Sequence, residues 1–186
     1  MHDQDAVWQE FSQSMAFEGA LHLSVQALDA PPDAGALAGY NERNLHVLRA
    51  LASLDERRVE TGDDESPVLQ ELVRLDSKIN VLMEIVNRLL VPLDVLPPRL
   101  PVRFNALGVL LPAAALPPSA HLLVRLHFDA CRALPLEMAV QFVRTQDDAH
   151  AFAGFIKPSE MVNEGLERFV FRHHRRKVAE ARLTSV

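Results

Sequence analysis

Residues 68–89 read VLQELVRLDSKINVLMEIVNRL and contain the most regular pattern of the chain. Seven apolar residues recur there at alternating spacings of four and three, as a heptad repeat: Val68, Leu72, Leu75, Ile79, Leu82, Val86 and Leu89. Most positions between them are polar or charged, so a helix would gather the apolar side chains into a narrow stripe. A stripe of this width is typical of a helix that packs on other helices, as in a coiled coil.

The residues on either side of the heptad predict a helix over residues 66–90. Ser66 suits the N-cap, Pro67 suits the first helical position, and three acids at positions 63–65 favour the positive end of the helix. Pro92 and the later pair Pro97-Pro98 cannot continue a helix.

Upstream, the sequence predicts a strand and a second long helix, after weak helical spacing in residues 1–16. Apolar and polar residues alternate over residues 17–28, as in a half-buried strand. Leucines at helical spacing then predict a helix over residues 37–59. This helix could form a hairpin with helix 66–90 in one chain, leaving two hairpins to close a dimer. Alternatively, four exposed heptad stripes could close a tetramer, which we expect.

Downstream, the pattern changes to short strands and ends in a helix over residues 161–177. The predicted strands are residues 101–111, 121–128, 136–144 and 151–156, and residues 112–119, 129–135 and 145–150 are predicted loops. The expected fold class is α+β, with a small antiparallel β-barrel, a C-terminal helix, and two long helices that form an oligomerising coiled-coil or bundle module. The expected units are residues 1–30 with a barrel strand, 31–95 as the helical module, and 96–186 as barrel and final helix.

The composition bounds the class of protein. The 186 residues are 48% apolar with a net charge of −6, which supports a folded core and argues against nucleic acid as a partner. The single cysteine, Cys131, fits a reducing compartment. No basic and apolar leader begins the chain, and no apolar run approaches the ~20 residues of a membrane span. We therefore expect a cytoplasmic protein without membrane insertion.

The residues that could carry chemistry are scattered. The eight histidines lack metal-binding spacing, and His173 and His174 are consecutive, so a helix would point them about 100° apart. The seven glycines form no phosphate-cradling loop. We predict no catalytic site, no metal and no cofactor. The basic run over residues 168–177 is interpreted as the solvated end of a helix, with an acidic protein surface as the alternative.

The order of features in the last half of the chain resembles the PilZ domain. The features are a strand pair with a glycine turn at residues 103–111, strands at 122–126, 138–144 and 152–156, and the closing helix. The resemblance implies a six-stranded β-barrel whose typical members bind the bacterial second messenger cyclic-di-GMP. It also implies a non-enzymatic regulatory or adaptor protein of surface motility, type IV pili or virulence.

The ligand motifs of that family are an upstream Arg-x-x-x-Arg and an Asp/Asn-x-Ser-x-x-Gly turn. Gly108 matches the turn's glycine, but Arg103 stands in place of the acid and Asn105 in place of the serine. No Lys or Arg precedes Arg43, and the pair Arg99-x-x-x-Arg103 overlaps the turn itself, so we interpret it as coincidence. We expect a divergent PilZ domain that no longer binds cyclic-di-GMP and acts on an unidentified protein partner. The alternative is a rearranged receptor site using Arg99, Arg103, Asn105 and Gly108.

Overall fold

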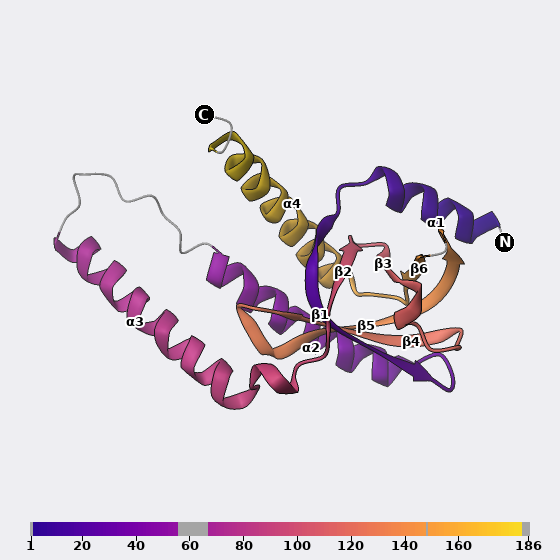
Figure 1. The fold of residues 1–186 in the computed structure, drawn as a ribbon, viewed down its shortest axis with the longest axis horizontal. Helices are drawn as coiled ribbons and strands as arrows, with labels where there is room; N and C mark the ends of the chain where they lie inside the picture. The colour runs from indigo at the N-terminus through magenta and orange to yellow at the C-terminus, as the bar shows by residue number, and fades with distance from the viewer. Residues whose placement is uncertain (1, 56–66, 148, 184–186) are drawn as a thin grey trace.

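Six segments of the chain with alternating or consecutive apolar residues close into one β-barrel around a shared core (Figure 1). The computed structural model describes residues 2–55, 67–147 and 149–183. The helices and strands are α1 (His2–Gln13), β1 (Phe17–Leu28), α2 (Ala34–Asp55), α3 (Pro67–Leu90), β2 (Arg99–Phe104), β3 (Gly108–Pro112), β4 (His121–Phe128), β5 (Cys131–Thr145), β6 (His150–Phe155) and α4 (Glu160–Leu183). Single 3₁₀ turns follow α3 and β3.

The strand order around the barrel is β1-β2-β3-β6-β5-β4, and every neighbouring pair is antiparallel. The first half of β1 pairs with β2, placing Phe17 opposite Phe104, and its second half pairs with β4, placing Leu23 opposite Leu126. The N-terminal strand thus closes a barrel whose other strands follow both long helices in sequence. The predicted α+β class with a small antiparallel barrel is confirmed.

Helix α4 completes the core at one side of the barrel. Phe169 packs between three phenylalanines that come from β1, β2 and β4, with ring centroids 5.1 to 6.0 Å away: Phe17, Phe104 and Phe128. Gly165 lies where α4 meets α2, and a Cβ there would approach Leu48 Cδ1 to 2.9 Å. The glycine therefore lets the two helices come together closely.

Helix α2 packs on β5 and α4 rather than forming a hairpin with α3. Buried Asn44 joins α2 to β5 because its side-chain amide donates to the carbonyl of Glu137 and its oxygen accepts from the amide of Glu137, both at 2.7 Å. Arg43 and Arg125 bind the carboxylate of Glu137 at 2.7 and 2.9 Å. The hairpin expected as an alternative is therefore not the arrangement of this chain.

Several boundaries differ from those predicted, such as the end of α4 at Leu183 instead of residue 177, and two of the differences have a clear cause. Residues 129–135 were expected to form a loop, but β5 already begins at Cys131, and Asp129 and Ala130 alone connect it to β4. Pro135 is tolerated in β5 because the register with β4 shifts between Leu126 and Phe128. Helix α2 begins at residue 34 instead of 37, since the Asp33 carboxylate accepts the amide of Ala36 at 2.8 Å as an N-cap.

Some sequence-based expectations lie outside the described residues. These are the N-cap role of Ser66, the acids at positions 63–65, and residues 56–59 of the predicted second helix. The helix with the heptad, predicted over 66–90, is described from Pro67 to Leu90.

Candidate functional sites: the α3 stripe and the barrel turn

Helix α3 exposes its whole heptad. We call the seven heptad residues the α3 stripe; their exposed fractions range from 44% at Val86 to 77% at Leu89. Four apolar neighbours on the same helix are also exposed, between 38% and 65%: Val81, Met83, Ile85 and Leu90. A large exposed apolar face of this kind marks an interaction surface rather than a solvated helix.

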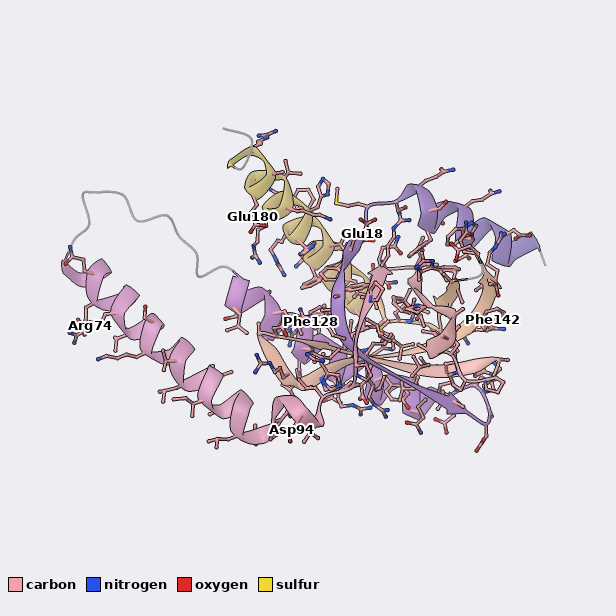
Figure 2. All side chains as sticks on the ribbon, viewed as in Figure 1. Glu18, Arg74, Asp94, Phe128, Phe142 and Glu180 are labelled. Carbon is pink, nitrogen blue, oxygen red and sulfur yellow. The ribbon has the colours of Figure 1, made fainter. Side chains whose placement is uncertain are left out.

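The position of α3 explains this exposure. In Figure 1 the helix runs beside the barrel as a separate arm, and its main contact with the rest of the chain is β5. Figure 2 shows its side chains projecting away from the barrel, with Arg74 near the start of the arm. Arg74 forms an exposed i, i+3 ion pair with Glu71 at 3.2 Å, outside the stripe. The fold thus holds α3 at one end and leaves the stripe uncovered by the described chain.

The barrel turn, residues 103–108, contains three of the residues considered for the alternative nucleotide site. Asn105 is 4% exposed; its side-chain oxygen accepts the amide of Leu107 at 2.8 Å, and its amide donates to the carbonyl of Phe11 at 3.4 Å. Gly108 lies against β6, where a Cβ would come within 2.5 Å of the carbonyl oxygen of Ala153. Both residues therefore have structural roles in closing the turn and docking α1.

Arg103 is held by the segment that precedes β1. Its guanidinium donates to the carbonyls of Ser12 and Ser14 at 3.1 and 3.5 Å, lies 3.4 Å from the Glu18 carboxylate, and stacks over the ring of Phe11 with 5.1 Å to the centroid. Both hydrogen bonds come from one nitrogen, Nη2, and the Phe11 ring covers one face of the plane, so part of the group that would bind a phosphate or stack on a guanine is engaged.

Arg99 points to a different part of the barrel. It forms a two-pronged ion pair with Asp129 at 2.8 and 3.2 Å and donates to the carbonyl of Ala20 at 3.1 Å. Arg99 and Arg103 lie four residues apart on β2 and so on one face of the strand. Their partners nevertheless separate them, because one binds the β4–β5 turn and the other binds the end of α1.

Helix α1 covers this side of the barrel. Phe11 is fully buried against Phe152, with 4.6 Å between ring centroids, and Trp8 stacks on Phe11 at 5.7 Å. Arg144 lies over the ring of Trp8 at 5.8 Å and pairs with Asp5 at 3.4 Å. In the sequence, this helix was visible only as weak helical spacing in residues 1–16, which includes Trp8 and Phe11.

A hollow of about 460 Å³ opens where the segment between α1 and β1 meets α4. Arg103, His174 and Lys177 line it together with Glu18, whose carboxylate lies 3.9 Å from the Lys177 ammonium and 3.4 Å from Arg103. His173 lines the same hollow, with its ring 4.4 Å from that of Phe17. The basic run on α4 is thus partly engaged with the barrel, and Glu18 offsets the positive charge of the hollow.

The histidines, the single cysteine and the long helices were the remaining features of the sequence. No group of three or more His, Cys, Asp and Glu side chains there could hold a metal ion. Burial raises the pKa of the Cys131 thiol, and a backbone hydrogen bond at Leu134 opposes this shift, so the environment disfavours the thiolate. None of the described helices is long and apolar enough to cross a bilayer.

Comparison with known proteins agrees with the barrel. The chain matches the family model described as "Atypical PilZ domain, cyclic di-GMP receptor" over residues 48–183, and it belongs to that family. A solved structure of similar fold has a TM-score of 0.68 and 22% identity, covering 94% of this chain and 97% of the other. It is a pathogenic protein from Xanthomonas campestris, described as a new tetrameric PilZ domain self-assembled via an unusual helical bundle. No curated protein sequence matches this chain.

Proposed function

We propose that this PilZ protein is a homotetrameric regulatory adaptor that acts through protein contacts, catalyses no reaction and does not bind cyclic-di-GMP. One observation supports the assembly: all seven residues of the α3 stripe are exposed, each by 44% or more. Each such side chain stabilises an interface by about 1.5–3 kcal/mol when it is buried. We therefore assign the stripe as the oligomer interface and α3 as the assembly module.

Two features favour a tetramer over a dimer. Helix α2 is committed to β5 and α4, so α3 has no second helix of its own chain with which to build half of a four-helix bundle. Met83, Ile85 and Leu90 widen the apolar face beyond a two-stranded seam, as in helices that pack in larger bundles. Four α3 helices from four chains satisfy both features. The Xanthomonas campestris protein, described as tetrameric through a helical bundle, supports this assignment.

The contacts of the barrel turn support the absence of cyclic-di-GMP binding. A ligand with two phosphates and two guanines needs paired guanidiniums, but Arg103 is held by Ser12, Ser14 and Glu18, and Arg99 by Asp129. One arginine–phosphate contact contributes about 1.5–3 kcal/mol, well below the ~8 kcal/mol of micromolar affinity. Arg103 is engaged by the end of α1 and Arg99 by the β4–β5 turn, so the two guanidiniums have separate partners.

Family membership supports a regulatory role, and we assign it to surface motility, type IV pili or virulence in the bacterial cytoplasm. Deletion of the gene, followed by complementation with wild type or with an assembly-deficient variant, tests this role. We expect wild type alone to restore the regulated behaviour. Full rescue by the assembly-deficient variant would contradict a function that depends on the tetramer.

Calorimetry separates the proposal from the alternative of an atypical cyclic-di-GMP receptor, which the description of the family favours. We expect no heat of binding when cyclic-di-GMP is titrated into the full chain, and no change on Arg103→Ala. A micromolar isotherm that Arg103→Ala or Arg99→Ala abolishes would establish the alternative site formed by Arg99, Arg103, Asn105 and Gly108.

Charge placed in the stripe tests the assembly. We expect Leu75→Asp with Leu82→Asp to dissociate the tetramer, because buried carboxylates without partners cost several kcal/mol each. Gln70→Asp with Ser77→Asp is the matched control: the same charges, seven residues apart on the same exposed helix, but outside the stripe. Sedimentation should show monomers for the first pair and an unchanged assembly for the control.

A further inference from the structure

From Arg168 onward, the side of α4 that faces away from the barrel combines apolar and basic side chains, whereas the exposed acids Glu160, Glu164 and Glu167 lie on this side in the first two turns. We call the following residues the α4 outer face: Met161, Arg168, Phe171, Arg175, Val178 and Arg182. Their spacings place them on one side of the helix, opposite the buried side that includes Val162, Leu166 and Phe169. Met161, Phe171 and Val178 are 59%, 52% and 37% exposed, so three large apolar residues lie open on one side of a helix that is docked by its other side.

The first half of the α4 outer face borders a groove of about 370 Å³ between α2 and α4. Leu45, Leu48 and Met161 form its apolar lining, and the exposed Arg49 and Arg168 stand at its sides. Phe171 and Arg175 follow Arg168 by one and two turns on α4, so an alternating apolar and basic strip extends along the helix from the groove.

Two charges of this strip, Arg168 and Arg175, make exposed local contacts. Arg168 pairs with Glu164 one turn earlier at 3.0 Å, and the two side chains are 72% and 54% exposed. Arg175 lies over the ring of Phe171, with 5.9 Å to the centroid. Exposed pairs of this kind contribute little and open readily, so both guanidiniums are available to a partner.

We infer that the α4 outer face and the α2–α4 groove dock an acidic amphipathic helix of another protein. An apolar stripe on such a helix would cover Met161, Phe171 and Val178, and carboxylates beside the stripe would meet Arg49, Arg168 and Arg175. This inference rests on the proposed adaptor function and names the surface and the chemistry of its partner.

Nucleic acid suits the same arginines less well. A phosphate backbone offers nothing to bury Met161 and Val178, and the net charge of −6 of the whole chain opposes a polyanion at long range. An acidic amphipathic helix suits both the apolar residues and the arginines of the α4 outer face, because it presents apolar and anionic groups with the same helical periodicity.

Fluorescence anisotropy with a synthetic probe tests the inference on the full chain. The probe is a labelled helical peptide with leucines at i, i+3, i+4 and i+7 and glutamates beside them; a copy with lysines for glutamates and a single-stranded DNA are measured in parallel. We expect the acidic peptide alone to bind. Phe171→Ala and Arg175→Glu should each weaken it by about tenfold or more.

Matched variants locate the site. Phe142→Ala removes another exposed phenylalanine, on β5 at the side of the barrel away from the end of α4 (Figure 2), and Lys157→Glu reverses an exposed charge off the outer face. Both should leave the affinity unchanged. Three outcomes would overturn the inference: no binding of the acidic peptide, equal losses of affinity in all four variants, or binding of the DNA with an affinity that Phe171→Ala leaves unchanged.

The mass of the same variants separates this inference from the proposed assembly. Intact tetramers that fail to bind the acidic peptide would refute the docking surface and leave the assembly standing. Dissociation by Phe171→Ala would place the α4 outer face in the assembly itself and refute its role as a free docking surface.

Discussion

Helices α2 and α3 are neighbours in sequence, with 22 and 24 residues and leucine-rich faces, yet the chain treats them in opposite ways. Helix α2 buries Val47, Leu48 and Leu51 to 4% exposure or less, whereas the α3 stripe is at least 44% exposed throughout. Apolar content therefore does not decide which helix joins the core.

The difference lies in what accompanies the apolar residues. Helix α2 carries Asn44 and Arg43, which bind the backbone and the carboxylate of Glu137 on β5 and fix the helix to one place on the barrel. The α3 stripe repeats every seven residues with leucine, isoleucine and valine, a pattern that fits another helix and not the curved surface of a barrel. Specific polar anchors mark the helix that docks within the chain, and strict periodicity marks the helix that we propose for assembly.

A leucine-to-aspartate substitution should have its most different effects in α2 and in α3. We expect Leu48→Asp to unfold the chain, because it buries an unpaired carboxylate against Gly165 and costs about 4 kcal/mol or more. Leu75→Asp should leave the barrel folded and weaken assembly only. Circular dichroism melting at low protein concentration checks both. Equal loss of the barrel transition in the two variants would refute the division of roles between α2 and α3.

Removing the polar anchor of α2 is the next largest change. Asn44→Ala deletes both hydrogen bonds to Glu137 and leaves its backbone groups unsatisfied, so we expect a loss of about 2–4 kcal/mol in the free energy of unfolding. Gln70→Ala, on the exposed side of α3, should change it by less than about 0.5 kcal/mol. Urea denaturation gives both values, and a similar loss for the two variants would argue against a special anchor in α2.

A change in the barrel turn should lower stability without touching the assembly. Gly108→Ala forces a Cβ to within 2.5 Å of the Ala153 carbonyl oxygen and 2.8 Å of the Phe152 ring, which we expect to cost about 1–3 kcal/mol. Gly35→Ala, at the start of α2, meets nothing closer than 3.4 Å and serves as the control. Thermal melting measures the cost, and sedimentation should show the assembly state of Gly108→Ala to be that of wild type.

Acid should weaken the docking of α2 on Glu137. We expect the resulting loss of stability to be smaller than that caused by the substitutions above. Burial by itself raises the pKa of Glu137, but hydrogen bonds from Arg125 and Arg43 and their positive charges outweigh it and hold the pKa below its ordinary value of 4.5. This stabilisation is present above the ordinary pKa and is lost as the pH falls through the lower pKa of the folded chain. Urea midpoints of wild type should therefore drop below about pH 4.5, and those of Glu137→Gln should drop less. Parallel curves would assign the acid sensitivity to other groups.

The sequence predicted the elements that depend on local periodicity. Residues 121–128 were predicted as a strand and form β4 with those bounds, and the glycine turn at residues 103–108 joins β2 to β3 as the resemblance implied. What covers each apolar face could not be predicted, because that depends on tertiary contacts. The docking of α2 on Glu137 is one example, and the burial of Phe11 over Asn105 is another. In the sequence, the one signal for the docking of α2 was Asn44, a polar residue within an apolar helix face.

The early start of β5 was missed for a different reason. Pro135 and residues 129–134 resemble a loop in the sequence. In the structure, the shift of register beside Phe128 accommodates Pro135 within a strand. The assignment of the heptad as an interface is likewise a statement about contacts that one chain cannot contain, and it stays a prediction.

Multi-angle light scattering of the wild-type protein at micromolar concentration tests the central claim most directly. One chain has a mass of 20.8 kDa. We predict a mass four times that value, constant on dilution, because four α3 stripes bury one another. A mass equal to one chain would contradict the account, since it would leave seven exposed apolar residues on α3 without a partner.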